Sequence, residues 1–240
     1  MRLALLEVMM VDDGAPRGRL MFDAERVRRF TAIEPRLICL HSRALPERAR
    51  VERYIEEAYS QAFNGRIRSH YPILISVQDR AGAIHAAAGF RLAGDHDLFL
   101  EQYLDLPVER AIAEGLGETV SRAAVAEIGN LASASPGASL FLFLALARHL
   151  EGIGCSHAVA TATRQLRRGF ARIGFDTQVL ARAEATRLAD GAADWGGYYE
   201  RDPEVRVGAI APALPALHQM LLADPILDAG VTPYLHPRLS

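Results

Sequence analysis

The sequence is poor in residues that form disulfides, bind metals or serve as hydrolytic nucleophiles. It has two cysteines, Cys39 and Cys155, and both lie in apolar runs, so we expect two buried free thiols in a reducing compartment. The eight histidines are scattered, and no pair has the spacing of metal ligands with acidic partners on one helix. No Gly-x-Ser-x-Gly nucleophile elbow occurs. We therefore expect no metal site, and a serine hydrolase is disfavoured.

Long apolar runs and a large excess of one charge are also missing. The most apolar segment, residues 140–150, is shorter than the ~18 residues that a membrane-spanning helix needs. The apolar N-terminus is interrupted by Glu7 and has only a weak cleavage site, which argues against a secretory signal. A net charge of -2 gives no indication of a broad nucleic-acid-binding face. These features predict a cytoplasmic globular protein that binds no nucleic acid.

The apolar patterning predicts a mixed α/β fold. Strands are expected at residues 36–43, 71–79, 83–94, 123–132, 156–163 and 177–183, and helices at 45–64, 108–117, 140–154 and 164–175. Residues 98–105 fit a strand or a helical turn. The strands on either side of Arg80 form a hairpin signal, and the later strand–helix–strand order implies a parallel pair with a crossover helix. We expect an N-terminal extension or edge strand at 1–35, the main domain at 36–210, and a C-terminal helix and tail at 211–240.

The segment AEIGNLASASPGASLF, residues 126–141, is the most informative stretch. It places Glu127 inside an apolar strand, and a turn of small residues then leads into a buried helix. Unpaired amides at a helix N-terminus can hold a phosphate, helped here by three serine hydroxyls and by the close approach that Gly137 permits. The alternative is that Ser135 caps the helix and Pro136 occupies its first position. The residues alone leave both interpretations open.

This layout resembles the GNAT acyltransferases. The order is a strand, an anion loop, a buried helix, a second strand and a helix that ends in Gly174-Phe175, within RRGFARIGF. In that fold the loop holds the pyrophosphate of acyl-CoA or the phosphopantetheine arm of an acyl carrier protein. The usual loop has a Gln or Arg followed by Gly-x-Gly or Gly-x-Ala, whereas residues 133–139 lack the long basic side chain and have one glycine. The resemblance thus implies a mostly antiparallel sheet with a splayed parallel pair, and it leaves the kind of thioester donor open.

Four motifs together resemble the thermostable hemolysin family over about residues 50–210. They occur in the family's order: LFLEQYLDLPVE (98–109), EIGNLAS (127–133), TATRQLRRGF (161–170) and WGGYYERDPEV (195–205). That family is grouped with GNAT-like proteins, and its name records an activity rather than a mechanism.

The hairpin and the AEIGNLA strand are also similar, more distantly, to acyl-homoserine-lactone synthases, which take an acyl group from acyl carrier protein. Those enzymes have an Arg near the end of the hairpin's second strand and a Glu on the next strand, where this chain has Arg91 and Glu127. They have a further Arg three residues beyond the Glu, where this chain has Asn130. The resemblance therefore does not carry over their acceptor.

Together the resemblances imply an N-acyltransferase that moves an acyl group from acyl carrier protein or CoA to an amine-bearing small molecule, with no tightly bound cofactor. A buried carboxylate can act as the base if burial raises its pKa, and the alternative is a purely structural pair with an arginine. The expected catalytic residues are Glu127, Glu101, Arg91 and Asn130. The expected donor-binding residues are Leu131, Ala132, Ser133, Ser135, Gly137, Ala138, Ser139, Thr161, Thr163 and Arg167. Backbone amides around residues 130–132 are expected to polarise the thioester carbonyl.

Other segments have both a functional and a structural interpretation. Glu101 and Glu109 either bind a cationic acceptor or are surface charges. The arginine-rich face of helix 164–175 either attracts an acidic carrier protein or is only solvated. The aromatic segment 195–199 either closes over the pocket, packs on the sheet or forms a homodimer contact. Two rival functions stay open: a membrane-active or lipid-binding protein, with residues 214–227 as its membrane helix, and a non-catalytic GNAT-like binding module.

Overall fold

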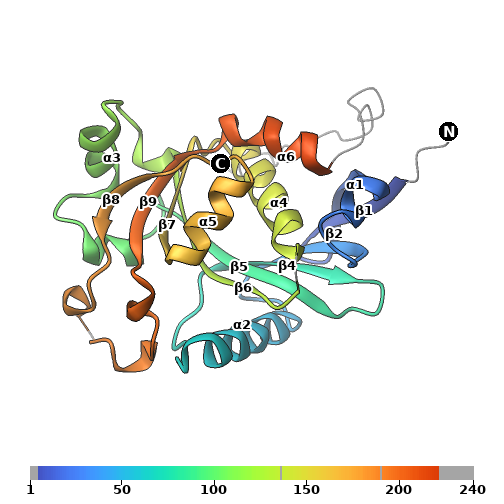
Figure 1. Ribbon diagram of the computed structural model, residues 1–240, viewed down its shortest axis with the longest axis horizontal. Helices are drawn as coiled ribbons and strands as arrows, with labels where there is room; N and C mark the ends of the chain where they lie inside the picture. Colours follow the sequence, from blue (N-terminus) through green and yellow to red (C-terminus); the bar gives the residue numbers. More distant parts are fainter. Residues whose placement is uncertain (1–4, 136, 190, 222–240) are drawn as a thin grey trace.

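A nine-stranded mixed sheet organises the chain, which the computed structural model describes over residues 5–135, 137–189 and 191–221 (Figure 1). The strand order is β2-β1-β3-β4-β5-β6-β7-β9-β8. The strands are β1 (Leu5–Asp12), β2 (Ala15–Asp23), β3 (Pro35–His41), β4 (Ile73–Asp79), β5 (Ile84–Leu92), β6 (Val125–Ser133), β7 (His157–Ala162), β8 (Gln178–Arg182) and β9 (Glu204–Ala209). The pairs β1–β3 and β6–β7 are parallel and the others are antiparallel, which confirms the expected GNAT-like architecture.

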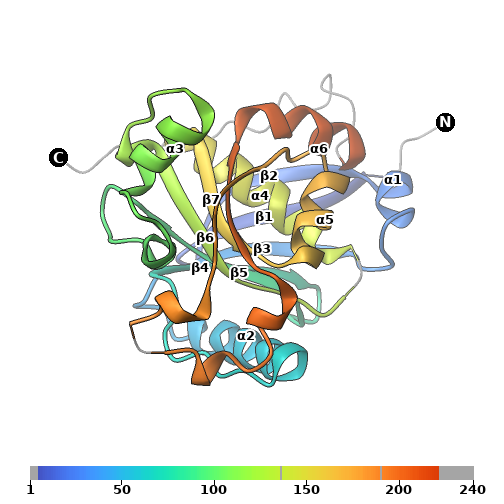
Figure 2. The same ribbon diagram turned by 60° about the vertical axis from the view of Figure 1, so that its left-hand side comes forward.

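Helices cover both faces of this sheet. They are α1 (Ala24–Arg28), α2 (Arg48–Phe63), α3 (Val108–Leu116), α4 (Ala138–Gly152), α5 (Arg164–Arg172) and α6 (Leu214–Leu221). Helix α2 lies on one face, and α4, α5 and α6 lie on the other (Figures 1 and 2). Helix α4 is apolar on nearly all sides because it packs between the sheet and the other helices of its layer. Shorter 3₁₀ turns include η1 (Phe99–Tyr103), which resolves residues 98–105 as a helical turn, and η5 (Tyr199–Arg201).

The N-terminal residues contribute more than an extension. Strands β1 and β2 continue the sheet beyond β3, with β2 at the edge, and both carry buried apolar side chains such as Val8 and Phe22. The two cysteines are buried free thiols, as expected, and burial raises the pKa of each to about 11.

Two strands of the sheet were not expected from the sequence: one of the two N-terminal strands, and β9. Strand β9 lies between β7 and β8 and is antiparallel to both. The connection from β7 through α5 to β8 therefore skips one strand position, which the chain fills later with β9. Its Val205 and Val207 alternate inward and are fully buried.

Helix α6 occupies the first part of the segment expected as a membrane helix. Leu214, Leu217 and Leu221 are buried in the same core cluster as α4, so this apolar face is covered by protein. Residues 222–227 of that segment lie outside the described part of the chain. Within the described ranges, no helix has both the length and the apolar character needed to cross a membrane.

Candidate active site

Strands β6 and β7 part in the middle of the sheet. Their parallel pairing ends at Ile128 and Ala160, although both strands continue. Beyond that pair, β6 has a bulge against β5, where Asn130 takes a left-handed conformation with a φ of 49°. Asn is one of the few non-glycine residues that adopt this conformation readily. The expected splayed pair is thus present, and we call the opening between the two strands the fork.

A polar, ring-lined cavity of about 280 Å³ opens on the α2 side of the fork. Its wall includes Gly129, Asn130 and Thr161, from the two strands that part. Arg66, Arg68 and Arg91 contribute positive charge, and Asp194 contributes one carboxylate. Six aromatic rings surround the space: Tyr59, Tyr71, Phe99, Tyr103, Trp195 and Tyr198. We refer to this space as the aromatic cavity.

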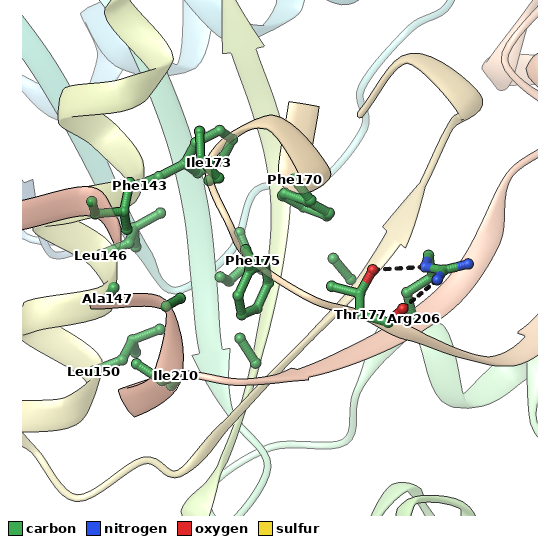
Figure 3. Close-up of a pocket in the computed structure, with 15 residues that line it drawn as sticks. Phe143, Leu146, Ala147, Leu150, Phe170, Ile173, Phe175, Thr177, Arg206 and Ile210 are labelled. Atoms are coloured by element: carbon green, nitrogen blue, oxygen red, sulfur yellow. Dashed lines mark hydrogen bonds between the residues drawn. The ribbon is translucent and has the colours of Figure 1, made fainter. Parts of the chain in front are cut away.

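A second, apolar cavity of about 40 Å³ lies on the opposite side, between the sheet and helices α4, α5 and α6 (Figure 3). Phe143, Leu146, Phe170 and Phe175 point into it, and Arg206 lies at one end, where it donates to the Thr177 hydroxyl at 2.8 Å. Ile128 lines both cavities. The two cavities therefore adjoin at the point where the strands part.

Glu127 lies beneath the aromatic cavity and does not line it. The residue is 1% exposed, and its carboxylate accepts hydrogen bonds from the backbone amides of Phe99 and Leu100, each at 2.9 Å. The Arg91 Nε lies 3.4 Å from Oε2, and the Tyr71 side chain is close enough to act on the pKa of Glu127 and lower it. Burial raises the pKa of Glu127, while Arg91 and the amides act in the opposite direction. The carboxylate therefore holds the η1 turn in place. It also interacts with the side chain of Tyr71, which lines the cavity.

Glu101 is engaged inside the protein and does not line the aromatic cavity. Arg122 binds both of its oxygens, at 2.5 and 2.9 Å, and also reaches Glu109 at 3.0 Å. The backbone amides of Leu98 and Val108 donate to Glu101 as well. The hydrogen bonds from Arg122 are the main reason why the pKa of Glu101 falls to about 2. This carboxylate thus has a structural role, through an ion pair and backbone hydrogen bonds, that the sequence did not reveal.

The serine-rich loop after β6 is tied to its surroundings by hydrogen bonds. The Ser135 hydroxyl lies 3.1 Å from the His85 ring, which in turn lies 2.9 Å from Asp79. The amide of Ala134 donates to Tyr54. Ser133, whose hydroxyl donates to the Ser135 carbonyl, is exposed, Ser139 is half-buried, and Ala138 is buried.

The start of helix α4 differs from the cap expected at Ser135. The helix begins at Ala138, and Gly137 is its N-cap in a left-handed conformation with a φ of 78°. A Cβ at Gly137 would lie 2.5 Å from the Phe30 carbonyl oxygen, so contact with the N-terminal segment requires glycine here. The alternative in which Ser135 caps the helix is therefore wrong, and residue 136 lies outside the described part of the chain.

The remaining expected donor-binding residues fall into two groups. Leu131, Ala132 and Thr161 lie on the strands at the fork, and Thr161 lines the aromatic cavity. Thr163 caps α5 through the amide of Leu166, and Arg167 is paired with Asp202 at 2.9 Å and Glu204 at 2.6 Å. The second group is thus occupied by contacts within the chain.

The aromatic segment 195–199 closes one side of the cavity. Gly196 packs against the carbonyl of Phe63, and the amide of Gly197 donates to that same carbonyl at 2.7 Å. Asp194 accepts two hydrogen bonds from Arg68, which adds a link to the residues after α2. We call residues 185–189 and 191–201, several of which line the cavity, the strap.

Tyr71 is one of the cavity residues that the sequence did not single out. It precedes β4, lines the aromatic cavity, and its ring lies beneath the guanidinium of Arg91, 4.3 Å from the ring centroid. Its only sequence signal is the position just before Pro72, at the beginning of a strand. The described residues contain no cluster of His, Cys, Asp and Glu side chains suited to a metal ion.

Several solved structures share this fold. The chain is similar to TofI in a ternary complex with an inhibitor and MTA, with 18% identity and a TM-score of 0.52 over 79% of this chain and 98% of that one. It is similar to the AHL synthase LasI, with 14% identity and a TM-score of 0.52 over 78% and 96%. The CoA-dependent acyl-homoserine lactone synthase BjaI, with SAM and isopentyl-CoA, gives 13% identity and a TM-score of 0.52 over 76% and 87%.

No curated protein matches the sequence significantly. The family model of thermostable hemolysin matches residues 41–214, which is most of the chain and contains all four motifs recognised in the sequence. The chain therefore belongs to the thermostable hemolysin family.

Proposed function

We propose that this protein is an N-acyltransferase that moves an acyl group from a phosphopantetheine thioester to an amine-bearing small molecule. One observation carries the proposal: at the fork, an apolar cavity and a polar aromatic cavity adjoin from opposite faces of the sheet and share Ile128. A thioester lying in the fork would direct its acyl chain into the apolar cavity. Its carbonyl carbon would then face the aromatic cavity, where an amine can approach.

The groups around the fork fit the two substrates. Backbone at Asn130, Leu131 and Ala132 runs along one side of the proposed donor arm, and Thr161 lies on the other side. The loop 133–139 and the first turn of α4 would receive the donor's phosphate, because a helix N-terminus favours anions. Thr163 and Arg167 have no part in this arrangement, since contacts within the chain already occupy them.

The donor is either an acyl carrier protein or coenzyme A, and the surface contains a feature relevant to each. BjaI, which shares the fold, is CoA-dependent. Arg168 and Arg172 on α5 are exposed, with no ion pair among the described residues, and such a basic face would attract an acidic carrier protein. Presenting the same acyl group on both carriers separates the two possibilities.

The alternative of a membrane-active protein has less support. Among the described residues, the exposed large apolar side chains are Leu5, Phe30, Ile153 and Val179, which lie on four different segments of the chain. The apolar face of α6 is packed on the core. Leakage of dye from phospholipid vesicles at low protein concentration would nonetheless favour that function.

The test is release of thiol from acyl thioesters. The folded protein is incubated with octanoyl-CoA or octanoyl carrier protein and with a panel of amino acids, polyamines and amino alcohols, and the amide product is identified by mass spectrometry. We expect thiol release that depends on one class of amine, with stoichiometric amide. Absence of thiol release with every pair, from a preparation with a cooperative unfolding transition, would overturn the proposal.

A further inference from the structure

Several elements hold Tyr71, which lines the aromatic cavity and whose side chain interacts with Glu127. Its backbone amide donates to the Asn130 side chain at 3.2 Å, and its carbonyl accepts from Arg48 at 2.6 Å. Arg48 is itself 5% exposed and also binds the carbonyls of His41 and Pro72. The backbone of Tyr71 is thus fixed by the β6 bulge on one side and by the first turn of α2 on the other.

Two glycines make the space for the Tyr71 ring. Gly89 and Gly129 face each other in the register of β5 and β6. A Cβ at Gly129 would lie 2.5 Å from Cε2 and Cζ of Tyr71. A Cβ at Gly89 would lie 2.6 Å from the Cβ of Tyr71. Any side chain at either position would displace the ring. The ring therefore lies directly across two strands, in a slot that only glycine permits.

The opposite side of the ring and the hydroxyl are also occupied. The Arg91 guanidinium covers the ring at 4.3 Å and pairs with Glu127 at 3.4 Å. The phenol is close enough to Glu127 for each group to shift the pKa of the other, and Glu127 has no surface of its own on the cavity. Tyr71 is consequently the connection through which a molecule in the cavity can exchange a proton with the buried carboxylate.

We infer that Tyr71 is a catalytic residue that passes a proton from the acceptor's ammonium group to Glu127. This inference rests on the proposed function and adds the route by which the amine is activated. Glu127 then acts through Tyr71 and is a positioning residue and proton acceptor. Other titratable groups that face the pair are Arg91, Tyr59 and Tyr103.

The transfer balances as follows in protons and bonds. The phenol gives its proton to the Glu127 carboxylate as it takes one from the ammonium, so Tyr71 is unchanged and the acceptor becomes a free amine. The amine nitrogen attacks the thioester carbon, a C–N bond forms and the C–S bond breaks. The departing sulfur takes a second proton from that nitrogen, which leaves an amide, a thiol and a protonated Glu127 that later loses its proton to water.

The electrostatics of the pair favour a concerted transfer. Burial and the charge of Glu127 raise the pKa of Tyr71 well above its ordinary value, so a free phenolate is disfavoured. Burial also raises the pKa of Glu127, which makes this carboxylate a better proton acceptor than an exposed one. A phenol that donates and accepts in the same step needs no charged intermediate.

Tyr71→Phe is the sharp test because it removes only the hydroxyl and retains the ring between Arg91 and the two glycines. Glu127→Gln is less informative, since an amide NH₂ would face the backbone donors of Phe99 or Leu100 and disturb the η1 turn. The matched control is Ser76→Ala, which also removes one buried hydroxyl. Ser76 is hydrogen-bonded to His41 at 2.9 Å and lines neither cavity.

The assay measures kcat/KM for an α-amino acceptor identified in the panel, with octanoyl-CoA or octanoyl carrier protein, between pH 6 and pH 9. At pH 7 we expect Tyr71→Phe to lose about 10²-fold, the usual contribution of a general base. With the acceptor supplied as an amino-acid amide, the deficit should shrink above pH 8, because such an α-amino group has a pKa of about 8 and arrives there already deprotonated. Ser76→Ala should stay within about twofold of wild type, and both variants should unfold within a few degrees of wild type.

Each outcome separates the relay from the proposed function. An active wild type with an equally active Tyr71→Phe variant overturns the relay and leaves the acyltransferase. A deficit of the same size at every pH also overturns it, because a structural defect does not depend on the protonation of the acceptor. A wild type that releases no thiol with any pair overturns the proposed function and the relay with it.

Discussion

Replacing Glu101 by Gln should lower stability at neutral pH and have little effect in acid. In the folded protein the pKa of Glu101 is about 2 instead of 4.5, chiefly because Arg122 donates to both of its oxygens. A difference of this size corresponds to roughly 3 kcal/mol at neutral pH. The side chain is 20% exposed, and solvent screening reduces this to about 2 kcal/mol. For a chain of this length, that is a decrease in the unfolding temperature of roughly 4–8 °C.

The pH dependence gives the sign of this effect. Because the folded pKa lies below the ordinary value, the stabilisation is complete above about pH 4.5 and is lost as the pH falls towards 2. Urea unfolding of wild type and Glu101→Gln at pH 7 and at pH 3 measures the difference at both ends. Glu109→Gln is the control, since that carboxylate has a single contact with Arg122, and we expect at most about 1 kcal/mol. Equal stability of wild type and Glu101→Gln at pH 7, or a gap that persists unchanged at pH 3, would refute the reasoning.

Three further variants address the cavities. Gly129→Ala should displace the Tyr71 ring, lower the free energy of unfolding in urea by about 1–3 kcal/mol and reduce the amine-dependent activity. Gly152→Ala, whose added Cβ meets nothing within 4 Å, should be neutral. A stable and active Gly129→Ala variant would contradict the inference that the Tyr71 ring needs glycine at this position. Asp194→Asn should weaken the ion pair with Arg68 that attaches the strap, so KM for the acceptor should rise and limited proteolysis between residues 185 and 201 should become faster. If KM and the proteolysis rate are both unchanged, this ion pair does not hold the strap in place. Ala147→Phe should fill the apolar cavity, so a series of acyl donors should show a shift of kcat/KM towards shorter chains; an unshifted series would place the acyl chain elsewhere.

The sheet around the site was largely predictable because its strands and helices differ in local pattern. Residues 123–132 and 156–163 carry short β-forming runs, and the apolar helix between them leaves little choice but a parallel crossover. Strand β9 was missed because its first residues were read as the end of the aromatic motif at 195–205. Its place between β7 and β8 depends on partners that the local sequence does not specify.

The site itself was only partly predictable, since its geometry depends on contacts between distant segments. Glu127 and Arg91 were identified from motif positions, and the structure places them 3.4 Å apart. Tyr71 acquires its environment from Gly89, Gly129 and Arg48, none of which is near it in sequence. The start of α4 likewise depends on the Phe30 carbonyl, so capping preferences at Ser135 gave the wrong boundary.

The contact between Gly137 and the Phe30 carbonyl has a practical consequence for work on this chain. The family match begins at residue 41, yet the segment before it supplies three strands of the sheet and the wall against which the serine-rich loop rests. An expression fragment limited to the matched residues would leave β4 as an unpaired edge strand and remove the contact between that loop and Phe30. The smallest piece suited to biochemistry accordingly starts ahead of β1.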